Sequence, residues 1–377
     1  MNYLPLSQVC LINMGQSPES SSYNENGNGL PFFQGNADFG ERHPITRVWC
    51  NAPTKIAHAG DILISVRAPI GAMNYATEEC CIGRGLAAIT PDTSKVSSEF
   101  IFWLLKGKNA ELNSKGTGST FKAIGRKVLE ETRVPDVSLE QQKEYARVLE
   151  SVYTIIRERR EQLHTFDQLI KGRFVEMFGD PETGKCGYKT ERLGNLTIKI
   201  SDGVHAKPVY TEVGKPFLSV VNINKGVVDF TDCKYVSEEA YQKMTKSTHP
   251  QKGDILYTKV GATYGIPAYV DTEKVFCLYV SVCLIKPKHG RINSRFLALQ
   301  MAMPSVKHQA DARIKGIGVP DLHLNQISEF NIICPPRDLQ DTFVRFVEQV
   351  DNSKAAVQEA LDRAQTLFDS LMQQYFG

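Results

Sequence analysis

The stretch Gly60-Asp61-Ile62-Leu63 returns 193 residues further along the chain as Gly253-Asp254-Ile255-Leu256. Further segments repeat at an offset that drifts from 193 to 200 and then settles at 198. These pairs are Ile70-Gly71 and Tyr264-Gly265, Thr77-Glu78 and Thr272-Glu273, Phe100 and Phe296, Lys115-Gly116-Thr117-Gly118 and Lys315-Gly316-Ile317-Gly318, and Met177-Phe178-Gly179 and Tyr375-Phe376-Gly377. Loop insertions in a duplicated ancestor produce such a drift. We therefore expect a duplicated skeleton with divergent loops, which suggests one task performed at two places with two specificities.

A long amphipathic segment closes each copy, over residues 138–178 and 337–377. Ser138-Leu139-Glu140-Gln141 has the form of a capping box, which predicts that the first helix begins there. Apolar and small residues recur in both segments at spacings of three and four, as in a coiled-coil seam. The expected seam residues are Val148, Val152, Ile155, Leu163, Phe166, Ile170 and Met177 in the first segment and Phe346, Val350, Ser353, Val357, Ala360, Ala364, Leu367 and Leu371 in the second.

A helix of about 38 residues is roughly 55 Å long, at about 1.5 Å per residue. Neither helix is expected to be stable alone with so apolar a stripe, and pairing with each other buries both stripes. Because the copies are repeats, a pseudo-two-fold arrangement makes the pair antiparallel. The alternative is two core helices, each packed on its own domain. We therefore expect an α+β protein of two tandem pseudo-repeated domains, residues 1–137 and 179–336, separated by two long helices that pair as an antiparallel coiled coil.

Composition narrows the class of protein. The 377 residues, 42% of them hydrophobic, are enough for two domains with a core each. The longest apolar run, residues 275–285, is far shorter than the roughly 20 residues of a membrane span, so we expect no membrane partner. Nine cysteines show no framework spacing and no zinc signature, which favours a reduced, cytoplasmic location without a metal site. Residues 179–336 carry 20 Lys and Arg against 15 Asp and Glu, a modest excess that permits DNA binding without demonstrating it.

Polar residues of the loops supply groups that read DNA. Asn and Gln pair with adenine, Arg and Lys with guanine, and Ser and Thr with base edges or phosphates. The candidate DNA-binding residues are Gln16, Ser17, Gln34, Asn36, Arg67, Arg84, Ser119, Thr120 and Lys122 in the first copy and His205, Lys207, Asn222, Asn224, Lys259, Tyr264 and Lys315 in the second. The alternative for each is an ordinary solvated loop residue. Arg67 and Lys259 form the strongest pair, because a basic residue follows the same short strand in both copies.

Lys115 and Lys315 stand beside glycines, either in a phosphate-holding loop or in a tight turn. The turn is favoured, because no Walker-type signature surrounds them. A search for catalytic motifs also finds no dinucleotide fingerprint and no methyltransferase tetrapeptide. Pro91-Asp92 and Asp271-Thr272-Glu273-Lys274 resemble the acids and lysine of a metal-dependent nuclease only weakly, since they lie at different places in the two copies. We expect no catalytic residue and no bound cofactor.

Several segments together resemble the specificity subunit of type I restriction-modification systems, and the resemblance covers the whole chain. The segments are Gly60 to Gly71, Cys81 to Ile89, Gly118 to Ile124, Leu139 to Gln142 and Met177 to Pro181. The resemblance implies two target-recognition domains, residues 1–137 and 179–336, alternating with two conserved helices, residues 138–178 and 337–377.

In such subunits each recognition domain reads one half of a split, asymmetric target in double-stranded DNA, and the helices fix the gap. The resemblance further implies two methyltransferase subunits and restriction/translocase subunits as partners. S-adenosylmethionine, ATP and Mg²⁺ are then cofactors of those partners and not of this chain.

Two other functions remain as alternatives: a self-contained nuclease with a duplicated DNA reader, and a non-catalytic protein-binding scaffold. Conserved landmarks are expected to be scaffold. The segments where the repeats fail to match, around residues 16–47 and 203–235, are the expected reading surfaces.

Overall fold

The computed structural model describes residues 2–118, 122–181, 183, 186–314 and 318–377. The chain forms two compact units. Unit 1 contains Met1–Gln162 and Val357–Gly377, and unit 2 contains Leu163–Ala356. Both long helices therefore contribute to both units. Among the described residues no helix combines the length and the apolarity that crossing a membrane requires.

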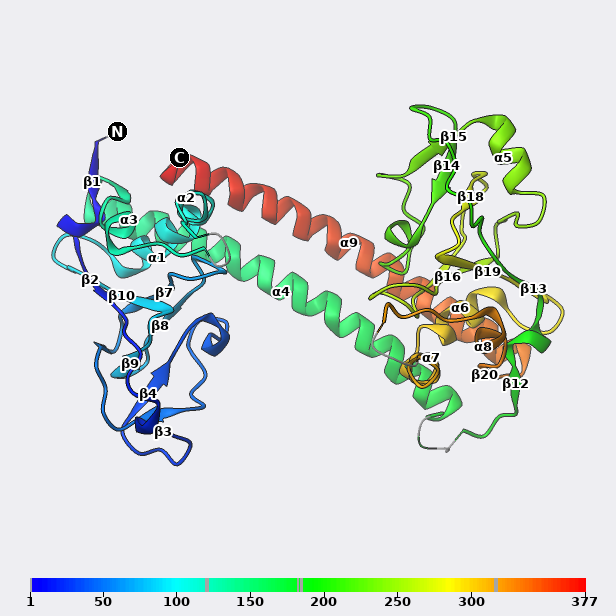
Figure 1. Cartoon of the computed structure of the whole chain (residues 1–377), viewed down its shortest axis with the longest axis horizontal. Coiled ribbons are helices and arrows are strands. Elements are labelled where there is room, and N and C mark those ends of the chain that lie inside the picture. The colour runs from blue at the N-terminus through cyan, green and yellow to red at the C-terminus, as the bar shows by residue number, and fades with distance from the viewer. Residues whose placement is uncertain (1, 119–121, 182, 184–185, 315–317) are drawn as a thin grey trace. The chain divides into compact units, whose positions relative to one another are not determined.

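Unit 1 is built on a four-stranded antiparallel sheet with the strand order β2-β10-β7-β8 (Figure 1). A second, mixed sheet has the order β3-β5-β4-β9-β6, and β1 pairs with β11. The strands are β1 (Tyr3–Pro5), β2 (Cys10–Met14), β3 (Tyr23–Asn24), β4 (Leu30–Phe33), β5 (Trp49–Cys50), β6 (Ile56–Ala57), β7 (Ile62–Ser65), β8 (Met73–Tyr75), β9 (Cys80–Ile82), β10 (Leu86–Pro91) and β11 (Arg133–Pro135). Every residue of β7 is buried, which explains the apolar run Ile62-Leu63-Ile64 that precedes its final Ser65.

Unit 2 repeats the four-stranded sheet, in the order β13-β19-β16-β17, and its second sheet has the order β15-β14-β18. The parallel pair β4 and β9 of unit 1 has its counterpart in β14 and β18, which are also parallel. The strands are β12 (Thr190–Arg192), β13 (Thr197–Asp202), β14 (Lys215–Leu218), β15 (Lys234–Val236), β16 (Ile255–Thr258), β17 (Pro267–Tyr269), β18 (Cys277–Leu278), β19 (Val282–Pro287) and β20 (Asn331–Ile333). The expected duplication of an α+β skeleton is confirmed.

The shorter helices also repeat. Helix α1 (Ser98–Gly107) is capped by Ser97 and α6 (Ser294–Met301) by Asn293, and each cap side chain accepts a hydrogen bond from the N–H three residues on. The remaining short helices are α2 (Asn109–Ser114), α3 (Arg126–Glu130), α5 (Glu238–Met244), α7 (Pro304–Asp311) and α8 (Leu324–Ser328), with 3₁₀ turns η1 (Leu6–Gln8), η2 (Ser20–Ser22), η3 (Asn36–Asp38), η4 (Leu193–Leu196) and η5 (Val220–Asn222).

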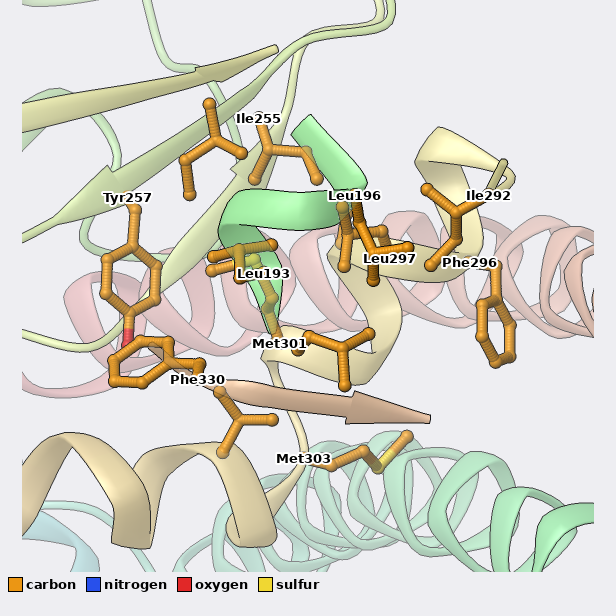
Figure 2. Packing of buried hydrophobic residues seen from close by; sticks show 14 of the residues in the cluster. Leu193, Leu196, Ile255, Tyr257, Ile292, Phe296, Leu297, Met301, Met303 and Phe330 are labelled. Atoms are coloured by element: carbon orange, nitrogen blue, oxygen red, sulfur yellow. The ribbon is translucent and has the colours of Figure 1, made fainter. Parts of the chain in front are cut away.

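The main core of unit 2 joins its sheet to its helices (Figure 2). Leu193 of η4, Tyr257 of β16 and Phe330 converge there, and the Tyr257 and Phe330 ring centroids are 6.0 Å apart. Phe174 and Phe178 of the first long helix belong to the same core. The helix is thus part of the fold of unit 2 as well as a connection to it.

The long helices are α4 (Leu139–Phe178) and α9 (Arg337–Phe376). The N–H of Gln141 donates to Ser138 Oγ at 3.3 Å, so α4 is capped as expected. In unit 1, Tyr145 stacks on Tyr375 with ring centroids 3.9 Å apart, and Arg160 donates to Gln365. The later residue of α4 meets the earlier residue of α9, so the helices are antiparallel there.

The same holds in unit 2, where the Lys354 ammonium lies 2.6 Å from an Asp167 carboxylate oxygen and the Phe174 ring lies 5.5 Å from the Phe343 ring. Antiparallel pairing is therefore confirmed within each unit, although the expected seam is wrong by one residue in places. Leu149, Ile156, Leu361 and Phe368 are buried, whereas the predicted Ile155 and Leu367 are 44% and 50% exposed.

The C-terminal end of α9 completes unit 1, beside α1 and α2 (Figure 1). Phe376 is buried, with its ring 5.4 Å from that of Phe100. The Tyr3 hydroxyl donates to the carbonyl oxygen of Gly377 at 3.1 Å. Unit 1 is therefore built from two stretches of chain that are far apart in the sequence.

Candidate nucleic-acid interface

Three loops of unit 1 meet at one edge, where strands β2, β4 and β9 end. The N–H of Gln16 donates to the carbonyl of Ile82 at 3.0 Å, and the N–H of Gly85 donates to that of Gln34 at 3.1 Å. Glycine makes this convergence possible: a Cβ on Gly15 would lie 2.2 Å from the Gly83 carbonyl oxygen. A Cβ on Gly85 would lie 2.4 Å from the carbonyl oxygen of Gln34. The backbones approach more closely than side chains allow.

Polar side chains gather on this edge. The Ser17 hydroxyl accepts from the Arg84 backbone N–H at 3.3 Å and from the Gln34 amide at 3.4 Å. Gln16, Gln34 and Arg84 are exposed. Asn36 is half-buried at the start of η3, the turn that follows Gln34. Four residues predicted from distant parts of the sequence therefore come together, and Asn36 lies close by along the chain.

Two further cations lie beside this cluster. The N–H of Val66 donates to the carbonyl of Gly85 at 2.9 Å, and the N–H of Ala68 donates to that of Lys122 at 3.1 Å. Arg67 and Lys122 are both exposed. We call Gln16, Ser17, Gln34, Arg67, Arg84 and Lys122 the unit 1 edge. The predicted residues Ser119 and Thr120 lie outside the described residues, as does Lys315 of the second copy.

Lys115 belongs to a different feature. Its ammonium lies 2.6 Å from the Glu111 carboxylate, one turn earlier on α2. A Cβ on the neighbouring Gly116 would lie 2.9 Å from the Ile70 side chain. These contacts favour the tight turn over the phosphate-holding loop for Lys115.

The same hydrogen bonds identify the equivalent edge of unit 2. The N–H of Val204 donates to the carbonyl of Leu278, and this bond matches the one from Gln16 to Ile82 in unit 1. The N–H of Tyr279 donates to the carbonyl of Leu218, and this bond matches the one from Gly83 to Phe33. The resulting equivalent pairs are Gln16 and Val204, Ser17 and His205, Gln34 and Ser219, and Arg84 and Val280. His205, a predicted contact, therefore occupies the position of Ser17 and is exposed.

The expected equivalence of Arg67 and Lys259 is wrong. The N–H of Lys259 donates to the carbonyl of Ser281, and the carbonyl of Lys259 accepts from the N–H of Leu322. In unit 1 the N–H of Val66 donates to the carbonyl of Gly85, and the carbonyl of Val66 accepts from the N–H of Ile124. Arg67 therefore corresponds to Val260. Successive side chains of a strand point to opposite faces, so this shift of one residue turns Lys259 inward. Its side chain is 6% exposed, whereas Arg67 is exposed.

Lys259 is held by two carboxylates. Its ammonium lies 3.2 Å from Asp321 Oδ1 and 3.7 Å from Asp202 Oδ1. Burial raises the pKa of the Asp202 carboxyl, and the nearby Lys259 acts in the opposite direction. His205 Nε2 lies 3.8 Å from Asp202 Oδ2. The Lys259 ammonium is therefore paired inside the protein and is not exposed to a ligand.

The other predicted residues of unit 2 have different roles. Asn222 is buried, and its side-chain oxygen accepts from the Ser219 N–H at 3.0 Å, closing η5 as the Asp38 carboxylate closes η3. The Tyr264 hydroxyl donates to Asp311 Oδ1 at 2.5 Å. Lys207 is exposed in the loop after β13. Asn224 is half-buried and lines a pocket of about 930 Å³ with residues of α6 and β17.

The predicted contacts do not include Val204, Ser219, Val260 and Val280, which share the unit 2 edge with His205. The signal was present in the offset of 193 between Gly60 and Gly253, which maps Arg67 onto Val260. Asn222 was predicted in place of Ser219 because an asparagine amide can pair with adenine. Among the described residues no group of three His, Cys, Asp or Glu side chains is arranged to hold a metal ion.

Comparison with known proteins agrees with the duplication. Residues 1–165 and 204–363 match the family described as type I restriction modification DNA specificity domain. The MjaX type I restriction enzyme specificity subunit of Methanocaldococcus jannaschii is 42% identical over 48% of this chain, a match that covers 41% of that protein. The MjaIX specificity subunit of the same organism is 25% identical over 82% of this chain and 75% of its own length. The crystal structure of the type I restriction-modification system S subunit from M. genitalium is 14% identical, covers 100% of this chain and 96% of its own, and has a TM-score of 0.60, which shows a shared fold.

Proposed function

Because the chain belongs to the family of type I restriction-modification DNA specificity subunits, we propose that it reads a bipartite, asymmetric DNA target, one half-site with each unit. In this family the chain is the DNA-recognition component and not the enzyme. The observation that carries the proposal is the duplicated edge, held by the same backbone hydrogen bonds in both units but bearing different side chains. A shared scaffold with different side chains is suited to reading two different sequences.

The proposed contacts in unit 1 are Gln16, Ser17, Gln34, Asn36, Arg67, Arg84 and Lys122, to which Ser119 and Thr120 are added from the sequence. In unit 2 they are His205, Lys207, Asn224 and, from the sequence, Lys315. Asn222, Lys259 and Tyr264 are proposed to act indirectly, because their polar groups already bond other residues. Arg67 and Arg84 carry fork-shaped donors on exposed side chains, and such donors suit guanine O6 and N7 or phosphate oxygens.

The two long helices are proposed to set the distance between half-sites, as a spacer of fixed length. The proposed domain boundaries remain residues 1–137 and 179–336 for recognition and 138–178 and 337–377 for the helices. We further propose that the chain acts in the cytoplasm and recruits two methyltransferase subunits and restriction/translocase subunits. Those partners would use S-adenosylmethionine, ATP and Mg²⁺.

The decisive experiment maps methylated adenines in the genome of a host that carries this chain with its partner subunits. The expected result is one modified motif with two short defined halves and a gap of constant length and free sequence. A strain that lacks only this chain is the control and should lose every such site. A single uninterrupted motif, or cleavage of DNA by the purified chain alone with Mg²⁺, would contradict the proposal.

A further inference from the structure

The two edges differ in chemistry at positions that the backbone makes equivalent. The N–H of Gly261 donates to the carbonyl of Pro320 at 2.9 Å, as that of Ala68 does to Lys122. Together with the matches given above, this bond defines four pairs. In unit 1 the positions hold Gln16, Arg67, Arg84 and Lys122, and in unit 2 they hold Val204, Val260, Val280 and Pro320. Three cations and an amide are replaced by three valines and a proline.

Lys259, a cation that directly precedes one of these positions, is turned away from the surface of unit 2. The Lys259 ammonium lies between Asp202 and Asp321, with 6% of its side chain exposed. Turning it outward would leave the buried Asp202 oxygen without a counter-charge, which is costly. Lys259 therefore stabilises the unit 2 edge through buried ion pairs and adds no positive charge to its surface.

Two exposed valines extend the apolar surface. Val221 lies two residues after Ser219 and is 64% exposed, and Val319 directly precedes Pro320 and is 74% exposed. Val204, Val260 and Val280 are half-buried, which leaves part of each side chain accessible. His205 and Ser219 are the polar groups at the equivalent positions. Such a surface has little to offer a phosphate or a guanine.

In the major groove the thymine methyl group is the feature that apolar side chains recognise, whereas N7 and O6 of guanine and N7 and N6 of adenine require hydrogen-bonding groups. We infer that the two units recognise different chemical groups of DNA: unit 1 reads polar purine edges through Arg67, Arg84, Gln16 and Gln34, and unit 2 reads thymine methyl groups through Val204, Val260 and Val280. The inference rests on the proposed function and specifies it for each half-site.

Modified DNA tests which chemical group each unit recognises. The full-length chain first selects its target from a duplex library with random positions. Arg67→Ala and Val260→Ala, substitutions at equivalent positions, then show which half of the selected target belongs to which unit. In the assigned duplex each thymine is replaced singly by uracil, which lacks only the methyl group, and each guanine by 7-deazaguanine, which lacks N7.

Uracil in the half-site of unit 2 should weaken binding about fourfold at one or more positions, the effect of one buried methyl group. Uracil in the half-site of unit 1 should leave the binding affinity unchanged. Substitution by 7-deazaguanine should weaken binding about tenfold in the half-site of unit 1, because it removes one arm of a bidentate contact, and have no effect in that of unit 2.

The outcomes separate the inference from the proposed function. If the chain selects a bipartite target but uracil has no effect in the half-site of unit 2, the inference is wrong and the function stands. Equal sensitivity of both halves to 7-deazaguanine also overturns it. If no sequence is selected, the proposed function fails first. Val280→Thr, which keeps the shape and replaces one methyl group by a hydroxyl, should reduce the uracil effect without unfolding the unit, and an unchanged uracil effect counts against the inference.

Discussion

At the scale of single residues, the two units show how a strand fixes the direction of each side chain. Ser65 and Thr258 end equivalent strands, and each hydroxyl accepts from a backbone N–H in the following turn, at 2.9 and 2.8 Å. The next residue is buried in both units, and the one after it faces the edge. Position in the strand, and not residue type alone, therefore decides which side chains face the edge.

The contact between Gly15 and Gly83 gives the first prediction. In Gly15→Ala the new methyl group would lie 2.2 Å from a backbone oxygen, so the loops of the unit 1 edge must separate. We expect a loss of about 1 to 3 kcal/mol in the free energy of unfolding, as for other overpacked sites. Thermal unfolding and binding to the selected duplex measure the effect. Gly35→Ala is the control, because no atom lies within 4 Å of its added Cβ, and equal losses from both variants would refute the explanation.

Lys106 gives a prediction on pH. Burial, reinforced by the neighbouring Arg42, lowers the pKa of its ammonium from 10.5 to about 8. Between these values the folded protein releases the proton before the unfolded chain does, so the free energy of unfolding gains a contribution that grows as pH rises from about 8 towards 10.5. Below pH 8 both states are protonated and the full penalty of burying the charge remains. Lys106→Met removes both the penalty and this pH dependence.

Urea denaturation of the wild type and of Lys106→Met at several pH values tests this, and the difference between the two proteins isolates the lysine from the tyrosines and cysteines. The variant should be the more stable below pH 8, with an advantage that shrinks by pH 10. A constant difference would contradict the prediction. Lys127→Met, at an exposed lysine of the same unit, is the control.

At the scale of elements, one glutamine at the start of each long helix joins that helix to its unit. Gln142 Oε1 accepts from the Ser97 N–H at 2.9 Å, and Gln340 Oε1 accepts from the Asn293 N–H at 2.8 Å. Their amide nitrogens donate to the carbonyls of Val137 and Pro335. Both glutamines are 2% exposed. The same bonds at both places explain why glutamine occurs in both copies of the repeat.

Substituting either glutamine by leucine should therefore be costly. The change leaves one buried N–H and one carbonyl without a partner, so we expect each variant to lose about 2 to 4 kcal/mol of stability. Chemical denaturation followed by circular dichroism measures the loss. Gln141→Leu, at an exposed neighbouring position on the same helix, should change little. Comparable losses at 141 and 142 would show that helix propensity, and not these hydrogen bonds, is responsible.

The sequence was sufficient to predict the duplication and the antiparallel pairing, because both depend on patterns spread over many residues. It was not sufficient for the seam of α4, where Leu149 and Ile156 replace the expected Val148 and Ile155. Leu149 and Ile156 lie seven residues apart, as do Val148 and Ile155, so spacing alone did not distinguish the two stripes. The role of Asn222 escaped prediction for a similar reason: an asparagine that caps a turn and one that reads a base have the same side chain, and only its burial separates them.

At the scale of the whole molecule, the spacer proposal makes a quantitative prediction. Deleting residues 160–166 of α4 and 355–361 of α9 removes one heptad from each helix, about 10 Å at about 1.5 Å per residue. Because base pairs are about 3.4 Å apart, the preferred gap should shorten by about three base pairs. Selection from duplex libraries with gaps of varied length measures this. An unchanged gap refutes the spacer, and deleting three residues from each helix, which disrupts the seam, should prevent folding.

The division of the chain also bears on how the protein is made. Unit 2 is one continuous stretch, Leu163–Ala356, whereas unit 1 needs Val357–Gly377 as well as Met1–Gln162. Domains generally fold as units during synthesis, from the N-terminal side onward. In this chain unit 1 begins first and is completed last, because its final segment follows the whole of unit 2. Until Phe376 is made, the surface around Phe100 that it covers stays open. We therefore expect unit 1 to stay accessible to chaperones and proteases for longer than unit 2 during synthesis.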